Sequence, residues 1–161
     1  PVPHEIVNEI IGDSAMAPSW KNCQPVRYIA VEDPALKEKI ASECVMDFQY
    51  NANTIRRCPL LMVIAIVHGR SGFERDGAFS TSKEDRWEMF DAGIATQTLC
   101  LSAHDRGIGS VVMGIFDEDK LAQVLQLPEG QIVGGLVAMG YPAETPATPK
   151  RKAVEDLLRY L

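Results

Sequence analysis

The chain has 161 residues, of which 46% are hydrophobic and 24% are charged, a composition typical of one globular domain with a hydrophobic core. Nucleic acids and anionic membranes bind proteins through a basic surface, whereas this chain has a formal net charge of −6. We therefore expect neither as a partner. The longest apolar run, residues 60–67, is much shorter than the roughly 20 residues of a membrane-spanning helix, which argues against a span.

The cysteines and histidines indicate neither a metal site nor a nucleophilic triad. The four cysteines form no Cys-x-x-Cys pair and have no histidine at zinc-ligand spacing, as in a reduced cytoplasmic protein. His4, His68 and His104 are far apart, and each lies in or beside an expected helix or strand. We therefore expect all three histidines to be structural.

The N-terminal third is expected to contain a helix, a loop, a strand and a second helix. Apolar residues at helical spacing predict an amphipathic helix over residues 4–14. Residues 17–25 contain two prolines and an asparagine, which favour a loop. Residues 26–31 are predicted to form a strand, and residues 34–46 a helix.

The middle of the chain is expected to hold a buried strand, a lid and a long helix. After an Asn-containing polar stretch, residues 60–67 are apolar throughout and predict a strand that is buried on both faces. Residues 69–83 are rich in glycine, serine and charge, so we expect a mobile surface loop that could serve as a lid. Residues 84–106 predict the longest helix. Because it is apolar on nearly all sides, we expect it to lie at a subunit interface.

The C-terminal third is expected to add a helix, a strand and an arm. Glycines in residues 107–110 end the long helix, and acidic residues 117–119 begin the next helix, which Pro128 ends. Residues 132–139 predict another apolar strand, and a proline-rich arm then closes with a short helix or strand over residues 154–161. The order of elements lacks a regular βαβ repeat, so the predicted fold class is α+β, with one sheet covered by helices.

Three separated segments of the chain resemble the nitroreductase family. The matching motifs are Ala17-Pro18-Ser19 with Gln24-Pro25-Val26-Arg27, then Asp91-Ala92-Gly93 with Gly107-Ile108-Gly109-Ser110 and Gly114-Ile115-Phe116, and finally Gly140-Tyr141-Pro142 with Pro149-Lys150-Arg151-Lys152. Each motif is weak alone, but their order and spacing make the combination specific. The resemblance implies a nitroreductase-like fold, in which a central and mostly antiparallel sheet is flanked by helices.

The same resemblance implies an interlocked homodimer with two FMN sites, each built from both subunits. It also implies that residues 1–161 form one FMN-binding domain. Family members carry a basic stretch that grips the FMN phosphate, and it precedes the helix that follows Pro1 to Pro3 in this sequence. We expect this phosphate-binding segment to be missing from the chain, and the phosphate to be held less tightly without it.

The resemblance implies that the loop at residues 17–25 contacts the flavin. Pro18, Ser19 and Asn22 are implied to approach the flavin from the second subunit, and Gln24 to reach the ring or the ribityl hydroxyls. The alternative is a loop fixed by its prolines, in which serine and asparagine satisfy only their own backbone.

A second implied contact is formed by Val112, Met113 and Gly114, whose backbone N–H groups would point at N5 and O4 of the ring. Glycine lets a backbone come close to a ligand. The alternative is that Gly107 and its neighbouring glycine cap a helix, and that Gly114 ends a strand.

Three further residues are assigned to the cofactor by resemblance. Arg151 and Lys152, in a run of three cations, match family cations that bind the FMN phosphate, although such a run is commonly a solvated face. Asn51 precedes the buried strand, where some relatives carry an asparagine that bonds the flavin pyrimidine. Its alignment stays open, because Asn53 fits the same position.

The implied reaction is a ping-pong transfer of hydride from NADH or NADPH, through FMN, to a nitroaromatic, a quinone or a similar small acceptor. Positioning and electrostatics are the protein's share of this reaction, so no dedicated acid or base is required. Two alternatives remain. One is related family chemistry, such as reductive dehalogenation or flavin breakdown, and the other is a non-catalytic dimer that binds flavin as a store or sensor.

Overall fold

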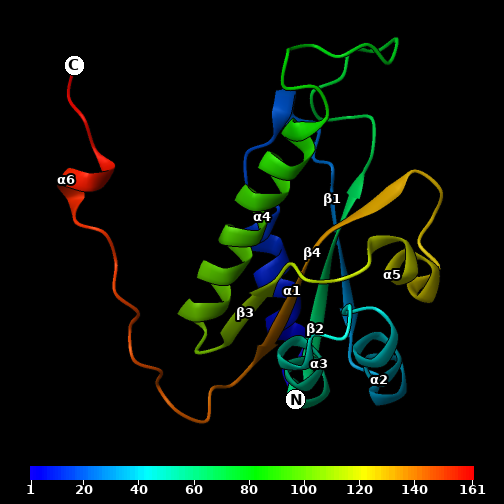
Figure 1. Ribbon diagram of the computed structural model, residues 1–161, viewed down its shortest axis with the longest axis vertical. Helices are drawn as coiled ribbons and strands as arrows, with labels where there is room; N and C mark the ends of the chain where they lie inside the picture. The colour runs from blue at the N-terminus through cyan, green and yellow to red at the C-terminus, as the bar shows by residue number, and fades with distance from the viewer.

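Four antiparallel strands form one sheet, which lies between two layers of helices (Figure 1). The computed structural model describes residues 1–161. The strand order is β1-β2-β4-β3, with β1 at Val26–Val31, β2 at Leu60–Val67, β3 at Gly109–Met113 and β4 at Gln131–Gly140. All neighbouring strands pair antiparallel. The predicted α+β class, an antiparallel sheet flanked by helices, is confirmed.

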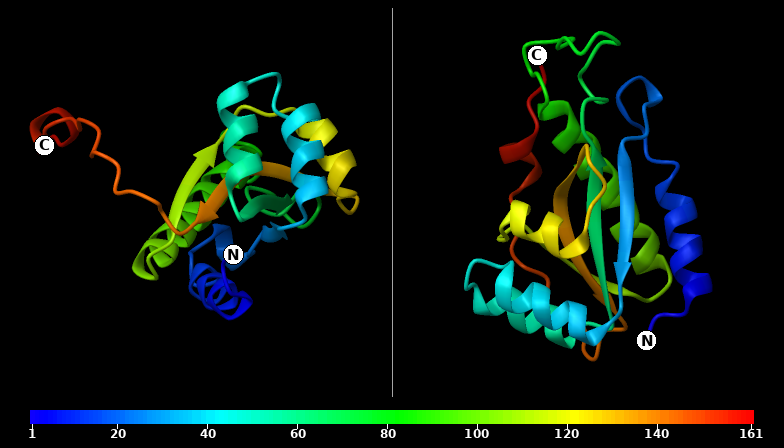
Figure 2. Two further views of the ribbon diagram at one scale, coloured as in Figure 1. Left: turned by 90° about the horizontal axis from the view of Figure 1, so that it is seen from below. Right: turned by 90° about the vertical axis from the view of Figure 1, so that its right-hand side faces the viewer.

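Two helices cover one face of the sheet and three cover the other (Figure 2). The first pair is α1 (His4–Ser14) with α4 (Arg86–Asp105), and the second layer contains α2 (Pro34–Glu43), α3 (Gln49–Arg57) and α5 (Glu118–Leu125). Because both faces of the sheet are covered, its central strand β2 needs no polar face. The uniformly apolar sequence of that strand is thereby explained.

The alternation of side chains along β2 divides the hydrophobic core into two halves. Leu61 and Val63 belong to the half that packs against α2, α3 and α5. Leu60 and Met62 belong to the other half, where Leu99 of α4 joins them. All five side chains are buried. Burial of each contributes about 1.5–3 kcal/mol relative to exposure, so the two halves together hold the helices on the sheet.

A bulge in β4 allows α4 to approach the sheet closely. The register between β2 and β4 shifts after Ile64, which leaves Gly134 as the extra residue of β4. A Cβ at Gly134 would lie 2.9 Å from Cδ1 of Ile66 and 3.4 Å from Cβ of Ala92 on α4. The absence of a side chain therefore leaves room for α4 at this point.

Helix α4 exposes apolar side chains as well as burying them. Met89, Phe90 and Leu101 are 46%, 58% and 60% exposed, whereas Leu99 is buried against the sheet. The predicted distribution of apolar residues around most of this helix is therefore confirmed, and its place at a subunit interface stays a prediction. The observed helix begins two residues later and ends one residue earlier than the predicted range 84–106.

The polar stretch before β2 contains a helix that the sequence analysis did not predict, α3 at residues 49–57. Its buried side chains are Asn51, Ala52 and Ile55, which lie on one side of the helix. Most of its other residues are polar, and one of its three buried residues is also polar. Sequence periodicity therefore gave little apolar signal for a helix.

The predicted surface loop, residues 69–83, is confirmed as a mostly exposed segment without a regular helix or strand, and its centre folds back on itself as a short hairpin. Phe73 and Phe79 form an antiparallel bridge with their rings 5.0 Å apart. The Ser80 N–H donates to the Gly72 carbonyl at 2.8 Å. We call this segment the lid hairpin. It lies at the same end of the molecule as the loop between α1 and β1 (Figure 2).

After β4 the chain leaves the sheet as an arm, residues 141–161, which stands apart from the body (Figure 1). The arm is irregular except for α6 (Val154–Leu157), which confirms the prediction of an extended segment closed by a short element. All of its residues are exposed, including Leu157 and Tyr160 at 70% and 88%. Among the helices of the chain, none combines the length and the hydropathy needed to span a membrane.

Candidate functional site

The α1–β1 loop, residues 17–25, has a strained backbone. It contains the short turn η1 (Trp20–Asn22), and Lys21, Asn22 and Gln24 have φ angles of 45°, 56° and 46°. Left-handed backbone of this kind costs about 1–3 kcal/mol for a residue other than glycine, and it persists only where neighbouring contacts fix it. Three such residues in one short loop mark it as a candidate binding segment.

Side-chain contacts fix the second half of this loop. The Gln24 N–H donates to Ser19 Oγ at 2.9 Å, and Arg27 Nη1 donates to the Gln24 carbonyl at 2.9 Å. The Gln24 side-chain amide donates to Asn22 Oδ1 at 3.2 Å. Pro18, Asn22 and Gln24 are exposed, whereas Ser19 is half-buried. Ser19 therefore serves its own loop, while the Asn22 amide nitrogen and the Gln24 side-chain oxygen are available to a ligand.

A cavity of about 240 Å³ opens beneath this loop, between α1, β1 and α4. Its wall includes Pro18, Ser19 and Gln24 from the loop, together with Tyr28 of β1 and Asp91 of α4. Burial raises the pKa of the Tyr28 hydroxyl, although a hydrogen bond with the Ser14 side chain acts in the opposite direction. Small-molecule sites commonly measure about 300–1,000 Å³, so this cavity alone is too small to enclose a flavin.

The second predicted segment lies at an open edge of the sheet. β3 is a terminal strand of the sheet, so one row of its backbone N–H and C=O groups has no partner strand. Val112 is 60% exposed, while the Met113 side chain is buried in the core and cannot reach a ligand. A Cβ at Gly114 would meet no atom within 4 Å, so packing within this chain does not require glycine there.

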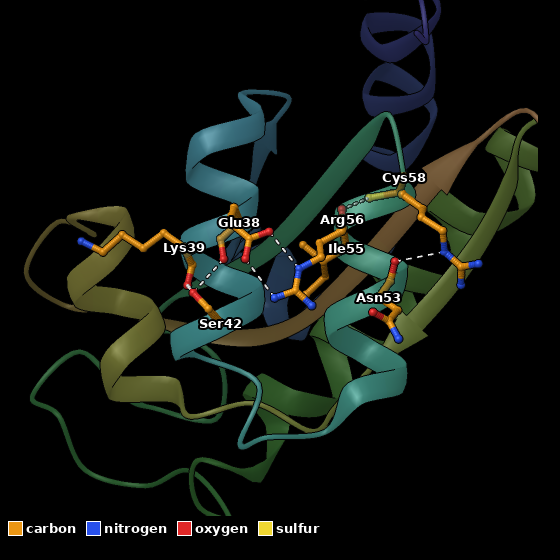
Figure 3. A network of polar contacts seen from close by, with 8 residues as sticks. Glu38, Lys39, Ser42, Asn53, Ile55, Arg56 and Cys58 are labelled. Carbon is orange, nitrogen blue, oxygen red and sulfur yellow. Dashed lines mark hydrogen bonds and ion pairs between the residues drawn. The ribbon is translucent and has the colours of Figure 1, made fainter.

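Asn51 lies beside this edge. Its side chain is buried on α3, and Nδ2 donates to the Ile115 carbonyl at 3.1 Å, next to Gly114. The structure therefore brings Asn51 next to the predicted segment 112–114, through a contact with Ile115, which lies 64 residues further along the chain. Asn53, the other asparagine considered, is exposed and its carbonyl accepts from Arg57 (Figure 3). The structure thus favours Asn51 over Asn53.

An ion pair holds α3 against α2 near this position (Figure 3). Arg56 donates to the two carboxylate oxygens of Glu38, at 2.8 and 2.9 Å. These hydrogen bonds lower the pKa of Glu38 and raise the pKa of Arg56. The pair is exposed, so we assign it a role in the orientation of α3 rather than a large share of stability.

The two predicted phosphate cations are not near the other site residues of the same chain. Arg151 and Lys152 are exposed on the arm, which stands apart from β3 and from the α1–β1 loop (Figure 1). Arg151 Nη1 donates only to the Pro149 carbonyl, at 3.3 Å. Within one chain, these cations are therefore not brought together with the two segments that are predicted to contact the ring.

Two buried carboxylates of α4, those of Glu88 and Asp91, were given no role in the sequence analysis, although Asp91 belongs to one of the family motifs. Asp91 is 3% exposed, and its Oδ2 accepts from the Trp20 N–H at 2.9 Å and from Ser71 Oγ at 2.7 Å. Glu88 is 1% exposed, and its Oε1 accepts from the Gly69 N–H at 2.7 Å. The available signal was a pair of acids three residues apart in a helix that is otherwise apolar on most sides, because a buried charge requires partners.

Comparison with known sequences identifies relatives along most of the chain. The nitroreductase family model matches residues 1–141. An NADH dehydrogenase of Thermus thermophilus is 29% identical, over 89% of this chain and 79% of that relative. An iodotyrosine deiodinase of Haliscomenobacter hydrossis is 25% identical, over 92% of this chain and 74% of that relative.

Solved structures share the fold. A nitroreductase family protein from Clostridium novyi NT superposes with a TM-score of 0.75 and 28% identity, over 89% of this chain and 76% of that protein. One from Streptococcus pneumoniae TIGR4 gives a TM-score of 0.84 at 19% identity, over 99% of this chain and 90% of that protein. Because the fold, the motifs and the match over residues 1–141 all agree, this chain belongs to the nitroreductase family.

Proposed function

We propose that this protein is an FMN-dependent oxidoreductase that transfers hydride from NADH or NADPH to a small acceptor, such as a nitroaromatic or a quinone. Membership of the nitroreductase family supports the general oxidoreductase activity. A solved oxidoreductase containing FMN, with a TM-score of 0.70 and 24% identity, has the same fold. We further propose that residues 1–161 form one FMN-binding domain that works in the cytoplasm, and the four free cysteines fit that compartment.

The observation that carries this proposal is the surface at the edge of β3. Val111 and Val112 are 41% and 60% exposed, so apolar surface lies uncovered there. Open space surrounds Gly114, and the Asn51 amide lies against the next residue, Ile115. A flavin ring requires a flat apolar slot with a few polar groups along one edge. The residues present fit that requirement.

When bound, FMN supplies a ring that takes hydride from the nicotinamide and gives it to the acceptor in turn. The chain's share is to bind and orient that ring. Backbone N–H groups of Val112 to Gly114 would donate to the ring edge, where they stabilise negative charge. Asn22 and Gln24 would add amide contacts from the α1–β1 loop. This arrangement requires no dedicated acid or base, because positioning supplies the rate advantage.

A homodimer would complete the proposed site. Phe90 and Leu101 on α4, with Leu157 and Tyr160 on the arm, give one chain a large amount of exposed apolar side chain. Monomeric proteins seldom expose extended apolar patches, and a two-fold pair would bury them. The arm would then lie on the second copy and carry Arg151 toward that copy's FMN phosphate, together with the adjacent Lys152.

Reductive dehalogenation is a second candidate function. It is favoured by the match to an iodotyrosine deiodinase, which is 25% identical to this chain. The lid hairpin lies at the end of the molecule that carries the α1–β1 loop, where it could cover an aromatic acceptor (Figure 2).

The test is to purify the full chain, titrate it with FMN, and measure oxidation of NADH and NADPH with menadione, a nitroaromatic and iodotyrosine as acceptors. We expect bound FMN, and nicotinamide oxidation that depends on an acceptor. Protein that FMN cannot reconstitute would overturn the proposal. Bound FMN without nicotinamide oxidation would favour a flavin store or sensor, and release of iodide would favour the second candidate.

A further inference from the structure

Asp91 joins the α1–β1 loop to the lid hairpin through a single oxygen atom. Its Oδ2 accepts from the Trp20 N–H at 2.9 Å and from Ser71 Oγ at 2.7 Å, and Cys23 Sγ lies 4.0 Å away. Asp91 and Ser71 are buried, at 3% and 0% exposure. Hydrogen bonds to an ionised acceptor are roughly twice as strong as neutral ones. One helix residue therefore anchors both segments.

The α1–β1 loop depends on such an anchor. Trp20 is the last residue before the left-handed pair Lys21 and Asn22, so its N–H fixes the point from which the strained backbone begins. The other fixed point is the Gln24 N–H, which donates to Ser19 Oγ. Because strained conformations relax when their supports are removed, loss of the Asp91 contact would free the half of the loop that carries Asn22.

Aromatic and ionic contacts join the same two segments. The rings of Trp20 and Trp87 lie 4.9 Å apart, which places the loop against the first turn of α4. Lys21 Nζ donates to Glu74 of the lid hairpin at 3.1 Å. A Cβ at Gly72 would collide with the Glu84 carbonyl, so the base of the hairpin fits closely against the start of α4. The loop and the hairpin therefore pack as one unit around α4.

Glu88 provides an internal comparison. It lies three residues before Asp91 on the same helix and is equally buried, at 1% exposure. Its oxygens contact the Gly69 N–H at 2.7 Å and His68 Nδ1 at 3.0 Å. Gly69 is the first residue of the lid hairpin and His68 directly precedes it, so neither partner belongs to the α1–β1 loop. The two carboxylates thus resemble each other in burial and charge but differ in what they hold.

We propose that Asp91 is a positioning residue for the flavin reaction, because its carboxylate holds the α1–β1 loop and the lid hairpin in the arrangement that binds FMN. This inference rests on the proposed function, since it takes Pro18 to Gln24 as contacts of the cofactor. Asp91 is 3% exposed, so we assign it no contact with the ring or the acceptor. It acts through the Trp20 amide and the Ser71 hydroxyl, and so sets the affinity for FMN before any hydride moves.

The experiment compares Asp91→Ala, Asp91→Asn and Glu88→Gln with the unmodified chain. FMN affinity is measured by fluorescence titration, and the position of the loop by near-ultraviolet circular dichroism. The chain has only two tryptophans, Trp20 and Trp87, so their coupled signal reports the contact between their rings without flavin. We expect Asp91→Ala to weaken FMN binding at least about tenfold and to remove the tryptophan signal.

The other two variants make the result specific. Asparagine retains an acceptor oxygen, so Asp91→Asn should restore most of the tryptophan signal and lose only about threefold to tenfold in FMN affinity. Glu88→Gln should keep both the signal and the affinity within about twofold of the unmodified chain, because it does not contact the loop.

The outcomes separate this inference from the proposed function. If the unmodified chain does not bind FMN, the proposed function fails, while the tryptophan signal still tests whether Asp91 holds the loop. If the unmodified chain binds FMN and Asp91→Ala binds it equally well, the inference alone fails. Equal losses of FMN affinity in Asp91→Asn and Glu88→Gln would show only general destabilisation of α4, and would also overturn the inference.

Discussion

The Asn51 side-chain amide donates a hydrogen bond from α3 to the Ile115 carbonyl, 3.1 Å away, at the point where the chain leaves β3. This contact fixes the turn after Gly114 against a helix that sequence patterns did not predict. Asn51 is 4% exposed, so its contact is protected from water. The edge that is proposed to face the flavin therefore has a rigid support on the side of α3.

Replacement of Asn51 by alanine should lower the free energy of unfolding by about 1–3 kcal/mol, because the Ile115 carbonyl loses its donor in a buried setting. It should also weaken FMN binding. Urea unfolding and FMN titration measure the two effects. The control is Asn53→Ala on the exposed side of the same helix, which should change stability by less than about 0.5 kcal/mol. Equal effects of the two substitutions would contradict the role of Asn51.

Gly114→Val should leave stability nearly unchanged, within about 0.5 kcal/mol, because a Cβ at this position would meet no atom of the chain within 4 Å. It should reduce FMN affinity if the backbone of residues 112–114 lies against the ring, since the added side chain would occupy that space. The matched control is Gly140→Ala. Its Cβ would lie 2.7 Å from Cδ of Pro59, so this variant should lose about 1–3 kcal/mol of stability.

Asn22→Gly should weaken FMN binding roughly threefold to tenfold, as expected for the loss of one neutral hydrogen bond. Glycine is the informative substitution, because Asn22 has a φ of 56° and glycine adopts that conformation without strain. The backbone of the loop should therefore be preserved while the amide is removed. Unchanged affinity in an FMN titration would remove Asn22 from the proposed site.

Asp13→Asn should destabilise the protein near neutral pH but not in acid. The pKa of Asp13 is lowered from its ordinary 3.8, first by a hydrogen bond from the Ser102 hydroxyl and further by Arg106, which both attach α1 to α4. A carboxyl whose pKa is lowered by folding stabilises the protein above its unfolded pKa, and this stabilisation is lost as the pH falls through the folded pKa. Urea unfolding across the acid range should show the free energies of unfolding of the two proteins converging as the pH falls below the ordinary aspartate pKa of 3.8. A difference in the free energy of unfolding that stays constant with pH would contradict a stabilising role of the Asp13 carboxylate.

Substitution of the arm's exposed apolar residues by serine should weaken the proposed homodimer at least about tenfold. The residues are Val154, Leu157, Leu158 and Tyr160. Each buries apolar surface only if a second copy covers it, so their removal should cost dimer affinity and leave the unfolding of the sheet unaltered. Sedimentation across a range of concentrations measures the association. A chain that is monomeric before substitution would refute the dimer.

Much of the fold was determined by local sequence pattern. The bounds of α1, β1 and β2 agree with the predictions from apolar periodicity and prolines, because each of these elements buries a regular apolar face or an entire apolar run. Each motif that resembles the nitroreductase family is a short contiguous run of residues, so the motifs could be recognised without a structure. α3 was missed because two apolar buried residues among mostly polar ones make too weak a signal.

The tertiary structure decided what these local patterns could not. It placed Asn51 beside the residue that follows Gly114, and it separated Arg151 from both segments of its own chain that are proposed to contact the ring. It also buried Asp91 and gave it partners that lie 71 and 20 residues away. A charged residue in a helix is exposed or buried according to what packs over it. The sequence therefore determined β1, β2, β4 and most helices, whereas the packing of the two loops on α4 decided where the proposed flavin site is held.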